Sequence, residues 1–166
     1  SRKEVDIERS FTFKHSGKKR KGVPVIAANM VNTGTFAMAK AFSQRKMMVA
    51  FHKHYGNTYI ENFFRDNTDK RDYSIYSMGI SDNELDKFKS VYNKQAPNLD
   101  FVCFDIANGY MEKFCDVIKK FRFNYPEVTI IAGNVVTPDM THQLILSGAD
   151  IVKIGIGSGS LCKTRL

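Results

Sequence analysis

The residues with the clearest chemical potential lie near the end of the sequence, where an apolar segment runs into a glycine-rich loop with one cysteine. Residues 151–156 are short, apolar and rich in branched side chains, a pattern typical of a buried strand. Gly157 and Gly159 follow, and they allow positive φ angles and a close approach of the backbone to a ligand. Cys162 comes just after the strand, where parallel α/β folds place reactive groups. Its thiol is a candidate nucleophile, although a tight turn with an inert cysteine has the same local pattern.

The other two cysteines are predicted to be packing residues. Cys103 lies inside an apolar strand-like segment, and Cys115 lies on a predicted helix face. A catalytic thiol needs access and a lowered pKa, which glycine amides and cations such as Lys153 or Arg165 could provide for Cys162. Three cysteines at unrelated spacings fit neither a disulfide framework nor a zinc site. We therefore expect a reducing, cytoplasmic location.

Further polar groups follow other apolar segments. His52 and His54 flank Lys53, and strand-like alternation would place the two imidazoles on one side and the ammonium on the other. Two histidines could bind a metal, but no third ligand is apparent, so a metal site of this kind is not favoured. Asp105 ends a later strand, where it could orient or neutralise a lysine.

Charge and composition narrow the classes of partner. The formal net charge is +8, with 43% hydrophobic and 25% charged residues, as in ordinary globular proteins. The densest basic run consists of Lys14 and residues 18–21, on either side of Ser16 and Gly17. It lies between two apolar segments and is predicted to be the solvated tip of a charged hairpin. We therefore expect an anionic small ligand rather than nucleic acid. No apolar run approaches the roughly 20 residues that a membrane helix needs, so we expect no membrane partner.

Strand-like and helix-like segments alternate along the whole sequence. The predicted strands are 24–28, 47–51, 73–78, 101–104, 128–132 and 151–156. The helices between them have recognisable ends: a candidate N-cap at 57–58, a capping box at 81–84, a Thr-Pro start at 137–138, and a C-terminal glycine at 148. This alternation predicts an α/β fold with a parallel sheet covered on both faces.

Two architectures have this alternation, a doubly wound sheet and a (β/α)8 TIM barrel. The repeat spacing favours the barrel, which takes about 250 residues. We therefore expect residues 1–166 to form a single catalytic-domain fragment that supplies about the first six strands of a TIM barrel, and to be inactive alone. Glycine or polar residues follow every predicted strand, and in a barrel these loops converge on the catalytic face. They are Asn29, 52–54, 77–79, Asp105 with 108–109, 133–134 and 155–164.

Several of these segments together resemble the family of IMP dehydrogenases and GMP reductases. The matching segments are 11–17, 22–24, 26–30, 34–36, 52–55, 101–103, 105–110, 132–137, 144–153 and the cysteine loop. The resemblance spans essentially the whole sequence. The segments 52–55 (His-Lys-His-Tyr) and 105–110 (Asp-Ile-Ala-Asn-Gly-Tyr) are similar to the GMP reductase branch, as is the lack of an inserted domain after the second strand.

The resemblance implies an NADPH-dependent reduction of GMP to IMP and ammonia in purine salvage, by a cytoplasmic homotetramer with a (β/α)8 barrel. Cys162 would form a covalent thioimidate at purine C2, and Thr164 would act in proton transfer with a glutamate from later in the family sequence. A monovalent cation, K⁺, would be bound near four positions: Gly157, Gly159, Cys162 and Arg165. The positions matching those that line the nicotinamide cofactor are Ser1, Arg2, Lys53, Asp105, Ile106, Ala107, Ile156 and Gly157.

The sequence departs from the family pattern at three places. Residues 31–33 are Val-Asn-Thr where the family has Asp-Thr-Val, Ser158 replaces a usual proline, and Lys163 replaces a usual threonine. Loss of proline makes the loop less rigid, and Lys163 could lower the pKa of the neighbouring thiol or crowd the nucleotide. Two alternatives stay open: an IMP dehydrogenase that oxidises IMP with NAD, and a fragment that binds nucleotide without turnover.

Overall fold

Six parallel strands form the main sheet, and each one pairs with the next strand in the chain. The computed structural model describes residues 4–95, 98–107, 109 and 112–156. The sheet order is β3-β4-β5-β6-β7-β8. Its strands are β3 (Ile26–Ala27), β4 (Met48–Ala50), β5 (Ser74–Met78), β6 (Phe101–Asp105), β7 (Thr129–Val135) and β8 (Ile151–Ile154). This unbroken sequential order is that of a (β/α)8 barrel and not of a doubly wound sheet, in which the order reverses. The predicted α/β class and the barrel-type strand order are confirmed.

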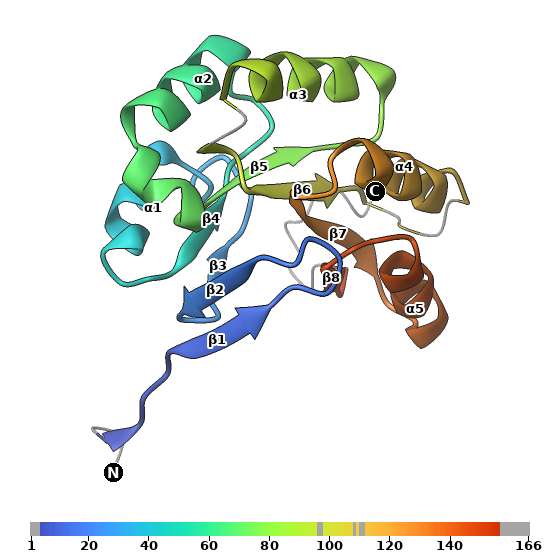
Figure 1. Cartoon of the computed structure of the whole chain (residues 1–166), viewed down its shortest axis with the longest axis horizontal. Helices are drawn as coiled ribbons and strands as arrows, with labels where there is room; N and C mark the ends of the chain where they lie inside the picture. The colour runs from blue at the N-terminus through green and yellow to red at the C-terminus, as the bar shows by residue number, and fades with distance from the viewer. Residues whose placement is uncertain (1–3, 96–97, 108, 110–111, 157–166) are drawn as a thin grey trace.

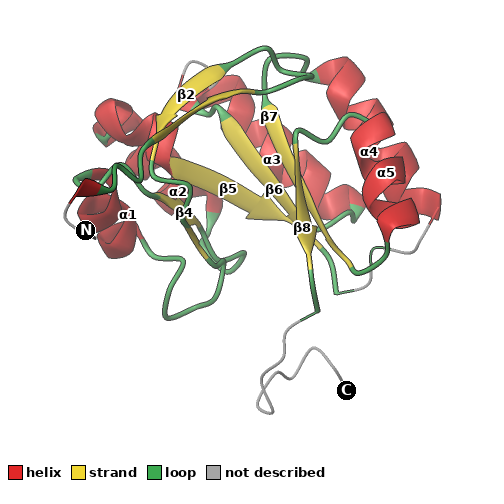
Figure 2. Ribbon diagram, turned by 90° about the horizontal axis from the view of Figure 1, so that it is seen from below, coloured by secondary structure: helices red, strands yellow, loops and turns green. Residues whose placement is uncertain are grey.

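A helix connects each strand to the next. The helices are α1 (Phe36–Ser43), α2 (Asn57–Asp66), α3 (Asp82–Gln95), α4 (Glu112–Asn124) and α5 (Pro138–Leu146), with a 3₁₀ turn η2 (Thr68–Tyr73) before β5. Figures 1 and 2 show these helices along the outside of a curved sheet. Fully buried Phe64, Phe88 and Phe114 pack from the helices against outward residues of the strands, such as Val102 and Ile130. The main core therefore lies between the helices and one face of the sheet.

The opposite, inner face of the sheet carries a smaller apolar cluster of its own. It contains Met48, Ala50, Ile75, Phe101, Cys103 and Ile131 from the strands and Phe13 from an N-terminal hairpin. Both faces of the described sheet are therefore covered, as predicted, but helices pack on the outer face only. The cause is the curvature, which turns one face inward. The edge strands leave apolar side chains in solvent: Ile26 is 40% exposed and Ile154 is 68% exposed.

An antiparallel hairpin precedes the main sheet. Strand β1 (Arg9–Thr12) pairs with β2 (Lys19–Gly22), so the predicted hairpin is confirmed. Its tip is not simply solvated, however. Ser16 Oγ lies 2.9 Å from Thr129 Oγ1 at the start of β7, Lys18 forms an ion pair with Asp100 just before β6, and Arg20 is buried. The hairpin therefore lies against the amino-terminal ends of the strands, opposite the edge where the polar loops begin.

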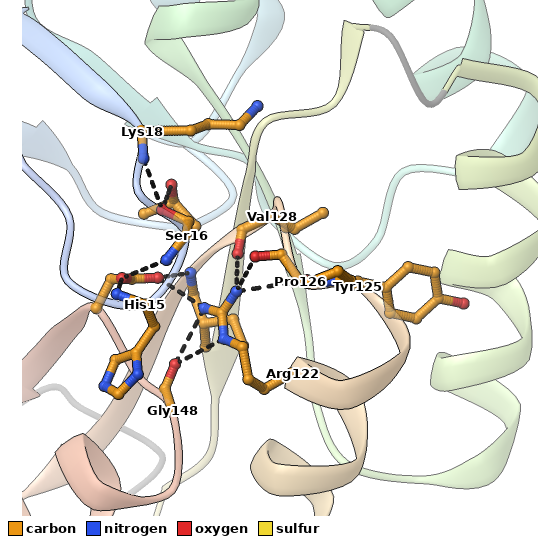
Figure 3. A network of polar contacts seen from close by, with 11 residues as sticks. His15, Ser16, Lys18, Arg122, Tyr125, Pro126, Val128 and Gly148 are labelled. Carbon is orange, nitrogen blue, oxygen red and sulfur yellow. Dashed lines mark hydrogen bonds and ion pairs between the residues drawn. The ribbon is translucent and has the colours of Figure 1, made fainter.

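Asp150 holds this hairpin in place. Its side chain is fully buried, and one oxygen accepts hydrogen bonds from the backbone N–H groups of His15 (2.8 Å) and Ser16 (3.1 Å). The other oxygen accepts from Arg122 Nη2 at 2.7 Å and from the N–H of Ile130 at 3.1 Å. Figure 3 shows the Arg122 guanidinium surrounded by backbone carbonyl groups, including that of Gly148. Four donors satisfy this carboxylate, as a buried charge requires.

The observed helix ends confirm some of the predicted caps and contradict one of them. The Glu84 N–H donates to Ser81 Oγ at 3.4 Å, which confirms the capping box, and the Glu84 carboxylate accepts from Ser81 Oγ and the Gly79 N–H at 2.7 Å each. Thr137 caps α5, with Pro138 in its first turn, and Gly148 follows that helix with φ of 111°. The predicted cap at 57–58 is wrong, because α2 starts at Asn57 itself and its N-cap is Gly56. Among the described helices, none has the length and apolar character needed to cross a membrane.

Candidate active site

A lysine and a carboxylate meet at the carboxyl edge of the sheet. Lys53 follows β4, and Asp105 is the last residue of β6. Parallel strands bring these ends to one rim, and Lys53 Nζ lies 3.4 Å from the backbone oxygen of Asp105. The Lys53 side chain is exposed, whereas Asp105 is half-buried. The structure therefore brings together these two sequence-predicted site residues at an exposed edge of the sheet.

The Asp105 carboxylate is bound mainly by other groups. Lys153, on β8, forms an ion pair with Asp105 Oδ1, and the Asn29 side chain after β3 hydrogen-bonds the same carboxylate. Burial alone would raise the pKa of Asp105, but these hydrogen bonds and the charges of Lys153 and Lys53 outweigh it and hold the pKa below its ordinary value. Asp105 is therefore ionised at neutral pH and has a defined orientation.

Stacked aromatic rings position the segment that carries Lys53. Tyr55 stacks on His52 with ring centroids 3.9 Å apart, and on its other side it stacks on Phe36, also at 3.9 Å. Phe36 in turn stacks on Phe63 of α2 at 4.7 Å. A column of four rings therefore ties the 52–55 segment to two helices, which limits where Lys53 can lie.

The two histidines follow the prediction only in part. The His52 and His54 rings lie 5.9 Å apart, but β4 ends at Ala50 and residues 53–54 form a turn, so strand alternation does not set their direction. Burial, with a smaller contribution from the charge of His54, lowers the pKa of His52. His52 is therefore neutral at neutral pH. No group of three or more His, Cys, Asp or Glu side chains suited to a metal exists among the described residues.

Three more predicted positions are described near this rim. The Ile106 N–H donates to the carbonyl of Gly133 at 2.9 Å, and the Ile106 carbonyl accepts from the Asn134 N–H at 2.9 Å, which continues the pairing of β6 and β7 beyond the ladder. Ala107 and Ile156 are exposed. Asn134 Oδ1 is buried and has no hydrogen-bond partner among the described residues, so this edge holds an acceptor that a ligand could use.

The remaining predicted site residues lie outside the described residues. They are Ser1, Arg2, Gly157, Gly159, Cys162, Thr164 and Arg165. Their assigned roles stay predictions. The packing roles predicted for the other cysteines are confirmed, because Cys103 is buried in the inner cluster and Cys115 packs against the main core. Burial raises the pKa of the Cys103 thiol to about 11, so it stays protonated and unreactive at neutral pH.

Two partners of Asp105 are not predicted from the sequence. The pattern predicts Asn29 at a strand end but not beside Asp105, and it predicts Lys153 only as a cation near Cys162. Lys153 is the lone charge in an otherwise apolar strand, β8, which is an available signal because a charged residue at an inward position needs a partner. Identifying Asp105 as that partner requires the register between the strands, which a local sequence pattern does not determine.

Comparisons with known proteins agree with this arrangement. A family model described as the IMP dehydrogenase / GMP reductase domain matches residues 3–166. Curated relatives include a GMP reductase from Klebsiella pneumoniae, 49% identical over 100% of this chain, and GMP reductase 1 from Rattus norvegicus, 47% identical over 99%. The chain spans about half the length of these relatives, 48% in both cases.

A solved structure supports the same assignment at the level of the fold. Inosine 5′-monophosphate dehydrogenase from Legionella pneumophila superposes with a TM-score of 0.74 at 28% sequence identity, over 98% of this chain and 48% of the other. Since the family model covers nearly every residue and the observed strand order is that of a barrel, the two lines of evidence agree. The chain belongs to the IMP dehydrogenase / GMP reductase family.

Proposed function

We propose that this chain forms part of an NADPH-dependent GMP reductase, which converts GMP to IMP and ammonia. The observation that carries the proposal is the name shared by relatives that are 47–49% identical over essentially the whole chain, GMP reductase. The likeness to an IMP dehydrogenase structure, at 28% identity, is the observation that favours the alternative, oxidation of IMP with NAD. Both reactions act at C2 of a purine nucleotide, so they share the nucleophile and differ in the direction of electron flow.

In the proposed reaction the Cys162 thiolate attacks C2 of GMP, the C2–N bond breaks, and ammonia leaves with a proton, so that a thioimidate links Cys162 to the purine. NADPH supplies the hydride that C2 then accepts. The C2–S bond breaks, the thiolate is released, and IMP and NADP⁺ are the products. Thr164 would pass protons together with a glutamate from elsewhere in the full-length protein. A potassium ion held by backbone carbonyl groups of residues 157–165 would order the cysteine loop.

The described rim has groups suited to a nicotinamide nucleotide. Lys53 offers an exposed ammonium for an anionic or hydroxyl-bearing portion of the cofactor. Asp105, kept ionised, accepts hydrogen bonds, and the buried unpartnered Asn134 Oδ1 is a further acceptor for an N–H or O–H group. These three residues would hold and orient the cofactor. Closure of the site by the rest of a barrel would strengthen each interaction by excluding water.

The decisive assay uses the full-length protein with two substrate pairs. We expect NADPH oxidation with GMP, with release of ammonia and IMP, and no NAD reduction with IMP at a comparable rate. NAD reduction with IMP and no reaction with GMP would establish the dehydrogenase instead. Binding of GMP without turnover in either assay would leave only the nucleotide-binding alternative.

The assembly and location of the enzyme are part of the same proposal. We propose a homotetramer in the cytoplasm, on the basis of the family resemblance. Sedimentation of the full-length protein measures the mass directly, and a species of two chains or one would contradict the tetramer.

A further inference from the structure

Asp105, Gly133 and Lys153 occupy one row across three adjacent strands. The register pairs Asp105 of β6 with Gly133 of β7, and Gly133 with Lys153 of β8. Each of the three is two residues beyond a member of the inner face: Cys103 and Ile131 belong to the inner cluster, and Ile151 packs against it. Since side chains alternate along strands, the row lies on the same inner face, one step nearer the carboxyl edge.

The middle position of this row has no side chain. A Cβ atom at Gly133 would lie 2.5 Å from Lys153 Cβ and 2.7 Å from the Lys153 carbonyl oxygen, both well inside normal contact. Lys153 therefore crosses β7 through the space that glycine leaves and reaches Asp105 two strands away. Any larger residue at position 133 would displace the Lys153 side chain or its backbone.

Lys53 and Lys153 contact different atoms of Asp105. Lys53 Nζ contacts the backbone oxygen of Asp105, whereas Lys153 Nζ contacts the carboxylate. Lys153 is the less exposed of the pair, and its side chain is 33% accessible. Lys153 and Asn29 hold the carboxylate by hydrogen bonds, whereas Lys53 acts on it through its charge and remains an exposed residue.

We propose that Lys153, reaching across Gly133, is a positioning residue that fixes the Asp105 carboxylate for a bound cofactor and keeps Lys53 available to it. The inference rests on the proposed function for the roles of Asp105 and Lys53. Lys153 would act on the cofactor through Asp105, and Gly133 would be needed because it leaves space for the Lys153 side chain. Within the part of the chain that the structure describes, the charged and titratable groups that act on the carboxylate are Lys153, Lys53 and the Cys103 thiol on its own strand.

The test compares Lys153→Met, Lys153→Arg and Gly133→Ala in the full-length protein. Lys120→Met serves as the matched control, because it removes the same charge from an exposed site on α4. Carbon-13 NMR titration of the Asp105 carboxyl is the first readout. In Lys153→Met and Gly133→Ala we expect the titration midpoint to rise by about one pH unit, while Lys153→Arg and Lys120→Met leave it depressed. An unchanged midpoint in Lys153→Met overturns the proposal.

Turnover with GMP and NADPH is the second readout. We expect Lys153→Met to lower kcat/KM for NADPH at least about tenfold, with the acidic limb of the pH–rate profile moved to higher pH, and Lys153→Arg to restore most of the activity. If the Asp105 titration shifts in Lys153→Met but its kinetics equal those of Lys120→Met, the proposal is overturned, because the Lys153–Asp105 pair would then not affect use of the cofactor. If the wild-type protein lacks GMP reductase activity, the proposed function fails, while the carboxyl titration still decides whether Lys153 sets the state of Asp105.

Discussion

Cys103 and Cys162 are chemically identical residues for which we expect opposite behaviour. Cys103 is 1% exposed, and burial raises its pKa to about 11, so the thiolate needed for attack is scarce at neutral pH. In the native full-length protein we therefore expect Cys162 to react with iodoacetamide and Cys103 to react only after unfolding. Peptide mass mapping after labelling distinguishes them, and native labelling of Cys103 would contradict its burial in the inner cluster.

Serine substitutions separate the two cysteines by activity. Cys162→Ser should abolish turnover and leave the circular dichroism spectrum unchanged, because a hydroxyl is a much weaker nucleophile than a thiolate. Cys103→Ser should retain most of the catalytic rate and lower the free energy of unfolding by about 1–3 kcal/mol, because it places a hydroxyl in an apolar cluster. IMP formation by Cys162→Ser at near wild-type rate would exclude the covalent mechanism.

At the scale of the elements, the capping box of α3 has a pH dependence with a definite sign. Burial would raise the pKa of Glu84, but its hydrogen bonds with Ser81 and the Gly79 N–H lower it below the ordinary 4.5. Its stabilisation is therefore complete above pH 4.5 and is lost as the pH falls through the folded-state pKa. Urea unfolding of wild type and Glu84→Gln at pH 7 and below pH 4.5 measures this, and we expect the difference to shrink in acid. Ser81→Ala should cost about 1 kcal/mol at pH 7.

The buried pair of Arg122 and Asp150 joins the hairpin tip to the helices and strands. Asp150→Leu should lower the free energy of unfolding by about 3–5 kcal/mol, because it leaves the guanidinium without its counter-charge. Hydrogen exchange at the His15 and Ser16 amides should accelerate in the same variant, since both donate to this carboxylate. Lys119→Met, which breaks the exposed pair with Asp116, is the control and should stay within about 1 kcal/mol of wild type. Equal effects of the two variants would contradict a stabilising role for the buried pair of Arg122 and Asp150.

Local sequence signals predicted the elements well and their long-range partners poorly. The capping box at Ser81, the Thr137–Pro138 start and the Gly148 stop all depend on residues within a few positions of one another, and all are present. The 57–58 cap was wrong because Gly56 begins the turn, although Asn57 is the better capping residue. The burial of Arg20 and the Lys153–Asp105 pair could not be predicted, because their partners lie 26 to 52 residues away and depend on register.

At the scale of the whole molecule, the sheet has two edges within the described residues. β3 and β8 lie at its ends, and both expose large apolar side chains, such as Ile26 and Ile154. Such edges can pair with other chains. A preparation of residues 1–166 alone should therefore associate with increasing concentration and should show no GMP-dependent oxidation of NADPH. Robust activity from a monomeric preparation would contradict both the barrel assignment and the residue roles built on it.

The contacts of the Asp150 carboxylate with the hairpin also have a consequence for the order of folding during synthesis. The contacts with His15 and Ser16 join residues 135 and 134 positions apart, so they span most of the chain. On the ribosome the hairpin emerges early, and it has no carboxylate to bind until residue 150 has been released. Docking of the hairpin through this carboxylate must therefore wait until residue 150 is available, even though most of the residues that pack with Phe13 in the inner cluster are released earlier.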